Sequence, residues 1–422
     1  MNKRITTLAT GSVLLALAVT GCSTKADSGS GNGNGGGGGS LKTDVGVTDK
    51  EINLAVQTDT SGVFKILGLG LTHGNEMWAE DVNAAGGICG RQIKLDIQDN
   101  GYKADNAVPL YETQKTNNLG FLQLIGSPIL AALKAKVIAD KIMTVTASWA
   151  STNLDAPEVM MIGQTYDVEI LNGLSWLQKQ GKLADGDKIG HIYIDSEYGQ
   201  NGLLGSQAYA KDHNMEVIGV PVAGTDTDMT ATITKLKSDG VKAIVATVAP
   251  GGMASIAVQN QAQGLNLPIV GSNPVFSPTL LSDPTVAAAL SNLYIVNSIG
   301  PFSQDDDFAK ELATKYKAKY TDEPNNGVNA GYVAGLAWEA ILKQACSDGD
   351  MTREGVLKAK TKVNAVDTKG MMGTLDFSKE GSPTTRQAFI EQADPSAEGG
   401  LKIVEELFES DEAKAYKAPF EK

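Results

Sequence analysis

Hydroxyl-bearing side chains follow two expected strands, at places where a bound anion could be held. Ser127 comes directly after the expected strand at residues 121–126, and a group of short residues at 146–151 follows the expected strand at 142–147. Ligands of open α/β sheets gather at the carboxyl ends of the strands, where helix N-termini also offer amide donors. We therefore predict that Ser127, as a helix N-cap, helps to hold a carboxylate. The further candidates in this group are Ser148, Trp149 and Ser151.

Each of these residues could instead have a purely structural role. Ser127 could only cap the helix, Ser148 and Ser151 could form turns, and Trp149 could pack between the lobes.

The loop at residues 58–67 also follows an expected strand. Ser61 and Phe64 in this loop could line a side-chain pocket, or they could belong to an ordinary loop.

The composition favours binding over catalysis. The 422 residues carry 36 Lys and Arg against 49 Asp and Glu, and the net charge of -13 gives no electrostatic reason to bind nucleic acid. With three histidines and three cysteines, the chain has little material for His-based catalysis or for a metal site. We find no nucleophile elbow, phosphate-binding loop, zinc-protease motif or dinucleotide motif. We therefore expect neither enzymatic activity nor a cofactor nor a bound metal.

The amino terminus has the features of an export signal. Two basic residues precede an apolar run at 13–19 that is too short to cross a membrane as a helix. The run ends in Leu-Ala-Val-Thr-Gly-Cys, which resembles the lipobox of bacterial lipoproteins; an ordinary signal peptide with a chance cysteine is the alternative. We expect residues 1–21 to be a signal peptide and residues 22–47 to be a Gly/Ser-rich tether that begins with lipidated Cys22. The mature chain would then be anchored at the extracytoplasmic face of the bacterial cell membrane.

Two further cysteines would lie in the same oxidising compartment. Cys89 is in a Gly-rich turn after an expected helix, and Cys346 is at the end of another expected helix. Because no other partner is available, we predict a disulfide between Cys89 and Cys346, the alternative being two unpaired buried thiols.

Short β-rich runs alternate with helical patterns from residue 50 onward, which predicts an α/β fold with parallel sheets flanked by helices. Four βα units extend to residue 147, and a second series begins at residue 167, which favours two Rossmann-like lobes. Further strands are expected at 293–299, 373–377 and 401–408, with a helix as the alternative for the last segment. We assign residues 48–166 and 300–365 to the N-terminal lobe, and residues 167–299 and 366–422 to the C-terminal lobe.

Several motifs, in this order, resemble those of leucine/isoleucine/valine-type solute-binding proteins. They are the helix end at 83–88 (NAAGGI), Gly126-Ser127, Thr146-Ala147-Ser148 and residues 195–199 (DSEYG), and the resemblance covers roughly residues 50–380. It implies a periplasmic-binding-protein type I fold, in which two lobes joined by three crossovers close on a ligand. It also implies service to an ABC importer, with permease subunits as partners, and we expect a monomer.

The resemblance implies roles for residues on the first wall of the cleft. In the family, a serine after the third strand and small or hydroxyl residues after the fourth strand hold the ligand's carboxylate. These positions correspond to Ser127, Ser148 and Ala150. Ala150 replaces a threonine and lacks its hydroxyl, which Ser151 could supply. The tyrosine of the second lobe corresponds to Tyr198, whose ring could cover the ligand.

Two positions depart from the family where it recognises an ammonium group. The family's acid corresponds to Asn273, and the aromatic residue beside it corresponds to Ala249. An asparagine offers only partial charge to a buried ammonium, so we expect carboxylate capture to be kept and ammonium capture to be lost. We therefore expect a lipoprotein that delivers a small carboxylate, an amino acid or related acid, to an ABC importer. The alternatives are a receptor module that senses its ligand, and a binder of an amide or aromatic acid without an ammonium group.

Overall fold

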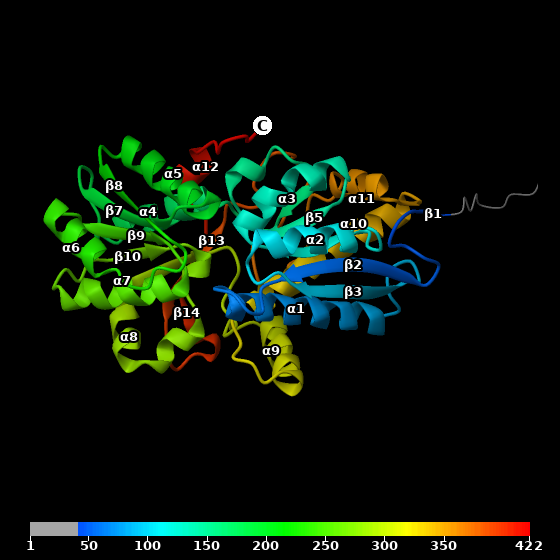
Figure 1. Cartoon of the computed structure of the whole chain (residues 1–422), viewed down its shortest axis with the longest axis horizontal. Helices are drawn as coiled ribbons and strands as arrows, with labels where there is room; N and C mark the ends of the chain where they lie inside the picture. Colours follow the sequence, from blue (N-terminus) through cyan, green and yellow to red (C-terminus); the bar gives the residue numbers. More distant parts are fainter. Residues whose placement is uncertain (1–40) are drawn as a thin grey trace, which may run out of the picture. The chain divides into compact units, whose positions relative to one another are not determined.

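The computed structural model describes residues 41–422, which lie within one compact unit, Ser40–Lys422. The expected signal peptide, the lipobox with Cys22 and most of the expected tether lie outside the described residues. Two β-sheets with their helices form two lobes, one coloured mainly blue to cyan and the other mainly green in Figure 1. None of the helices in residues 41–422 combines the length and apolar character needed to cross a bilayer.

The first lobe is built around a parallel five-stranded sheet in the order β3-β2-β4-β5-β6. Its strands are β2 (Glu51–Thr58), β3 (Gln92–Asp99), β4 (Gly120–Ile125), β5 (Thr144–Ala147) and β6 (Val159–Met161). Its helices are α1 (Lys65–Ala84), α2 (Ala104–Gln114), α3 (Ser127–Ala139), α9 (Asp307–Lys319), α10 (Gly327–Ser347) and α11 (Arg353–Lys360). One core lies between the sheet and the packed pair α1 and α10, and a second core lies between the sheet and α2 and α3. Strand β4 is buried along its whole length, as expected for a sheet that is covered on both faces.

The central strand β4 contains a β-bulge. Three residue steps of β4, from Phe121 to Leu124, lie opposite two steps of β5, and the pairing of β4 with β2 shifts in the same stretch. The bulge leaves Leu122 and Gln123 on the same side of the sheet, facing α1 and α10, where regular alternation would separate them.

The second lobe contains a seven-stranded sheet in the order β14-β13-β11-β10-β9-β7-β8. Its parallel strands are β7 (Lys188–Ile194), β8 (Glu216–Val222), β9 (Ala243–Thr247), β10 (Ile269–Gly271) and β11 (Leu293–Asn297). Strands β13 (Ala388–Ala393) and β14 (Leu401–Phe408) extend this sheet in antiparallel pairing. Its helices are α4 (Tyr166–Lys179), α5 (Glu197–Asp212), α6 (Thr230–Asp239), α7 (Pro250–Ala262), α8 (Pro284–Ala289) and α12 (Asp411–Ala415). The predicted α/β class with two lobes is confirmed.

The chain passes between the lobes three times: after β6, after β11 and before β13. The Gly163 N–H donates to Thr384 Oγ1 at 3.0 Å, and the Gln164 N–H donates to Ser298 Oγ at 3.1 Å, so all three crossovers are hydrogen-bonded together. Gly163 has a φ of +122°, and a Cβ there would lie 2.9 Å from Ser298 Oγ. Glycine therefore suits this position because other residues rarely adopt that φ and would crowd Ser298.

The carboxyl-terminal third differs from the sequence-based expectation. Residues 373–377, predicted as a strand, form only one isolated bridge, between Leu375 and Val366. Leu375 and Phe377 are buried in the first-lobe core, so the first lobe continues beyond the expected boundary at residue 365. The chain returns to the second lobe with β13, a strand that the sequence pattern did not predict.

Cys89 and Cys346 form a disulfide, with their Cα atoms 6.3 Å apart. The bond joins the turn after α1 to the last turn of α10, and both cysteines pack against the first-lobe core. It therefore links two segments 257 residues apart in sequence within one lobe.

Candidate ligand-binding site

The predicted carboxylate site lies at the ends of β4 and β5. Gly126 has a φ of +114°, and a Cβ there would lie 2.5 Å from Ile129 Cδ1, so glycine fits this turn. The turn makes Gly126 the N-cap of α3 and Ser127 the first helical residue, and the prediction of Ser127 as N-cap is therefore wrong. The Ser148 hydroxyl donates to Ser127 Oγ at 2.9 Å, and both residues are buried. Two of the predicted hydroxyls thus lie together.

Two tyrosines lie beside this pair of serines, and a third packs against one of them. The Tyr102 hydroxyl lies close to the Ser127 backbone amide, and the Tyr166 hydroxyl lies close to the Trp149 backbone and to the Ser127 side chain. The Tyr198 ring packs edge-on against Tyr166 with the centroids 4.8 Å apart, and its hydroxyl lies 2.6 Å from Ser272 Oγ. Burial raises the pKa of all three phenols, so they stay protonated at neutral pH and can donate hydrogen bonds to an anion. Hydroxyl donors from both lobes therefore converge here.

Ser151 lies in a different network, which joins the lobes. Its hydroxyl donates to Asp167 Oδ2 at 2.6 Å and accepts from Asn201 Nδ2 at 2.7 Å. Ala150 is fully buried beside it in the apolar cluster that also contains Trp149. The hydroxyl of Ser151 is thus used by protein groups, and the Ala150 methyl supplies packing.

Asn273 is bound to a carboxyl group that sequence reasoning did not identify. Its backbone N–H and its Nδ2 donate to Glu169 of α4 at 3.3 Å and 2.7 Å. Burial raises the pKa of Glu169 well above its ordinary value, and the hydrogen bonds from Asn273 oppose this rise only in part. An acid is therefore present on the second wall of the cleft, but Asn273 occupies both of its oxygens.

The remaining predicted residues lie where the lobes meet or on the loop above. Phe64 and Ala249 are buried in one apolar cluster that spans both lobes, and the Phe64 ring packs against Tyr102 with the centroids 4.8 Å apart. Ser61 is exposed, and its hydroxyl donates to Asp99 Oδ2 at 2.7 Å. Phe64 also borders an open hollow of about 350 Å³ between the lobes, which Tyr102 and Ile194 line as well.

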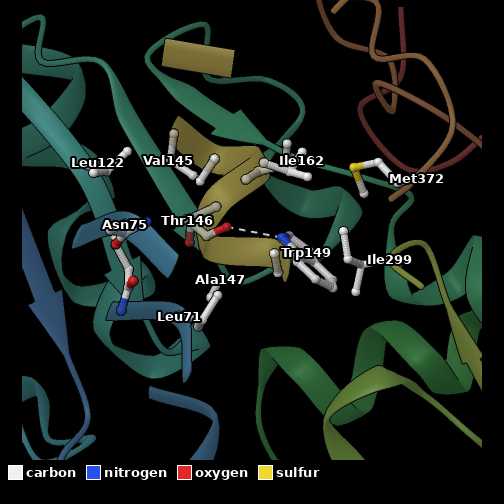
Figure 2. A pocket seen from close by; sticks show the side chains of 14 residues that line it. Leu71, Asn75, Leu122, Val145, Thr146, Ala147, Trp149, Ile162, Ile299 and Met372 are labelled. Atoms are coloured by element: carbon white, nitrogen blue, oxygen red, sulfur yellow. Dashed lines mark hydrogen bonds between the residues drawn. The ribbon is translucent and has the colours of Figure 1, made fainter. Parts of the chain in front are cut away.

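A mostly apolar pocket lies in the first lobe (Figure 2). Two of its lining residues, Ala147 and Trp149, flank Ser148 in the sequence. Trp149 forms part of its wall, and the indole N–H donates to Thr146 O at 3.0 Å, which fixes the ring. Leu71 belongs both to this pocket and to the apolar cluster of Phe64, so the pocket adjoins the cleft. The pocket is narrow and has room for about one water molecule. Further apolar lining residues are Val145, Ile162, Val333 and Met372.

Sequence reasoning missed three residues of this site. Tyr102 follows the carboxyl end of β3, so the rule that identified Ser127 could also have found it. Tyr166 and Glu169 lie in the first turn of α4, immediately after a crossover, and no local pattern marks them. Their position depends on how the second lobe meets the first, which only the tertiary structure gives.

A hydroxyl-rich cluster between two α/β lobes that are joined by three crossovers defines a two-lobed solute-binding protein. The sequence matches the family described as Periplasmic binding protein over residues 51–400, and the chain belongs to this family. This membership agrees with the expectation of binding rather than catalysis. A search of curated proteins finds no match.

Solved structures are similar to the chain over most of its length. One, described as a fatty acid ABC transporter substrate-binding protein from Thermomonospora curvata, is 36% identical, with a TM-score of 0.86 over 90% of this chain and 97% of that chain. A branched chain amino acid ABC transporter from Thermus thermophilus with bound valine is 17% identical, with a TM-score of 0.73 over 86% and 98%. A possible leucine/isoleucine/valine-binding protein from Rhodopirellula baltica is 15% identical, with a TM-score of 0.73 over 86% and 98%. The last two likenesses concern the fold alone.

Proposed function

We propose that this protein is the lipid-anchored, extracytoplasmic solute-binding component of an ABC importer, and that its ligand is a carboxylic acid with an apolar chain and no ammonium group. The observation that carries the proposal is the convergence of protonated hydroxyls next to an apolar pocket. Ser127, Ser148 and the three tyrosines would hold the carboxylate, and the pocket beside Trp149 would take the chain.

The hydrogen bonds between Asn273 and Glu169, the buried acid of the second lobe, support a ligand without an amino group. Glu169 is fully buried, its pKa is raised, and both of its oxygens accept hydrogen bonds from Asn273. Binding a ligand ammonium there would require breaking these hydrogen bonds and ionising the acid in a dry environment. The similarity to a protein that is described as a fatty acid transporter component points the same way.

Calorimetric titration of the protein, stripped of co-purified lipid, tests the ligand class. Hexanoate, octanoate, decanoate and dodecanoate should bind, whereas leucine and the primary alcohols of the same chain lengths should bind at least about tenfold more weakly, a difference of about 1.4 kcal/mol. Tighter binding of leucine than of every aliphatic acid would contradict the proposed ligand class.

A Ser127→Ala substitution tests the carboxylate site. Loss of a buried hydroxyl that bonds a charged group should weaken the affinity for the aliphatic acids by about 1–3 kcal/mol. Ser206→Ala is the matched control, since Ser206 is a buried serine of α5 whose hydroxyl bonds His191 at 2.8 Å, outside the site. Equal affinities of the two variants would remove Ser127 from the binding site.

Lipid anchoring and import have their own tests. The motif that ends at Cys22 supports lipidation, and mass spectrometry of the membrane-extracted protein should find an acylated Cys22 at its amino terminus. Adjacent genes for a permease and an ATPase would support import, whereas an adjacent sensor kinase would favour the receptor alternative.

A further inference from the structure

A buried amide faces the apolar pocket without a hydrogen-bond partner among the described residues. Gln123 is 3% exposed, and neither its Nε2 nor its Oε1 is paired in residues 41–422. Asn75 of α1, also fully buried, lines the same pocket (Figure 2); its Nδ2 donates to Gly331 O at 2.8 Å, but its Oδ1 has no partner there. An unpaired buried polar group costs about 1–3 kcal/mol, so two such amides in one pocket indicate a missing partner.

The bulge in β4 is what places Gln123 in this pocket. With regular alternation, Gln123 would share the face of Phe121 and point toward α2 and α3. The extra residue turns it to the side of Leu122 instead, against α1 and α10. Bulges are over-represented beside functional sites because they redirect a side chain. A bulged strand and an unsatisfied amide at one position together suggest that this polar group serves a ligand.

The chemistry of the two amides selects the kind of group that fits. Gln123 Nε2 is a donor, and Gln123 Oε1 and Asn75 Oδ1 are acceptors. A methyl-terminated chain would leave all three atoms unpaired, and a carbonyl could satisfy only the donor. A hydroxyl both donates and accepts, so it satisfies the donor and one acceptor at once.

We infer that this pocket is a subsite for a ligand chain that carries a hydroxyl group, held by Gln123 and Asn75. The inference rests on the proposed function, because the carboxylate of the same ligand would lie at Ser127 and Ser148. Ser127 follows Gln123 by four positions and lies just beyond the end of β4, so the Cα atoms of the two residues are at most about 13 Å apart. The hydroxyl would therefore lie toward the far end of a medium-length chain.

The pocket must widen to admit such a chain. It holds about one water molecule as it stands, so a ligand would displace side chains from its path. Met372 and Leu71 line it, and the unbranched Met372 side chain can change rotamer at low cost. A single trapped water is the competing occupant, and the experiment has to separate it from a ligand hydroxyl.

Paired titrations make this separation. Hexanoate, octanoate, decanoate and dodecanoate are each compared with their ω-hydroxy forms by calorimetry on the wild-type protein, Gln123→Met and Gln57→Met. At the chain length that reaches the amides, the wild-type protein should bind the ω-hydroxy acid at least about tenfold more tightly than the plain acid. Gln123→Met should reverse this preference, because an apolar side chain of similar length suits a plain chain.

Gln57→Met is the matched control. Gln57 is a fully buried glutamine of the neighbouring strand β2, and its Nε2 donates to Ala107 O of α2 at 3.2 Å, on the opposite face of the sheet. This variant should keep the wild-type preference for the ω-hydroxy acid. Equal loss of preference in both variants would show a general effect on the lobe and overturn the inference.

Each result is decisive. Binding of the plain acids with no preference for a hydroxyl at any length would overturn the subsite and leave the proposed function standing. Failure of every acid to bind would remove both.

Gln123→Met should also raise the melting temperature of the ligand-free protein, because it removes an unpaired buried amide. A lower melting temperature would show that water or protein already satisfies Gln123, and would overturn the inference.

Discussion

Three carboxyl groups are fully buried in the second lobe, and their hydrogen-bond partners distinguish their roles. Burial raises the pKa of each of them. Asp167 accepts hydrogen bonds from Ser151 of the other lobe and from Tyr416, which suits a group that joins segments. Glu169 is held by Asn273 at the cleft. Glu391 of β13 accepts only one bond, from Asn297 Nδ2 at 3.4 Å, and its Oε1 has no partner in residues 41–422. Of the three, Glu391 has the fewest hydrogen bonds to stabilise its ionised form.

A Glu391→Gln substitution should change how stability depends on pH. Burial raises the pKa of Glu391 from 4.5 to about 8, so the folded protein keeps a proton that the unfolded chain loses. The free energy of unfolding should therefore fall as the pH rises from about 4.5 to about 8. The glutamine variant should lose this part of the fall and be more stable than the wild type at pH 8 by about 1–4 kcal/mol.

Urea unfolding at closely spaced pH values measures the effect. Glu406→Gln on the neighbouring strand β14 is the control, since its side chain is exposed and the substitution should leave the slope unchanged. Parallel stability curves for wild type and Glu391→Gln across this range would show that Glu391 is already ionised in the folded protein.

The alternation of strands and helices in the sequence predicted most of both sheets. Apolar runs such as residues 52–57 and 243–248 are buried on both faces, which makes them visible in the sequence as parallel strands. Strand β13 was not predicted from the sequence because the buried Glu391 interrupts its apolar pattern. Residues 373–377 have strand-like composition, but Leu375 and Phe377 are buried in the core without a ladder.

The candidate site shows the same division between local and tertiary information. Ser127 and Ser148 could be predicted because residues after parallel strands gather at one edge of the sheet. The pairing of Asn273 with Glu169 joins residues 104 positions apart, and no local pattern reveals it. The placement of Gln123 depends on a bulge, and the period-two alternation of a regular strand predicts the opposite face for it.

The disulfide should stabilise the helix pair α1 and α10, which together line the apolar pocket. A Cys89→Ser/Cys346→Ser double variant should lose about 2–5 kcal/mol of unfolding free energy, since the bond closes a long loop in the unfolded chain. Chemical denaturation of the double variant and of the reduced wild-type protein should give the same loss. If neither loses stability, the bond does not constrain the unfolded chain.

The two lobes touch through polar contacts as well as through the apolar cluster of Phe64. Thr152 Oγ1 donates to Glu197 Oε1 at 2.5 Å, and Asn153 Nδ2 donates to the same oxygen at 3.4 Å. These residues lie in a short 3-10 helix of the first lobe, η1 (Ser151–Asn153), and at the start of α5 in the second. Such contacts exist only while the lobes are together, so they favour the closed state over an open one.

A Glu197→Ala substitution should shift the lobes toward the open state. Removing an acceptor that is shared by two donors across the cleft should weaken aliphatic-acid affinity by about 1–2 kcal/mol, although Glu197 lies outside the proposed carboxylate site. Because the closed state becomes rarer, small-angle scattering of the ligand-free variant should give a larger radius of gyration than the wild type, and saturating decanoate should restore the wild-type value. Glu409→Ala, at an exposed position after β14, should change neither quantity. Unchanged affinity and unchanged scattering for Glu197→Ala would mean that the contact at Thr152 has no part in closure.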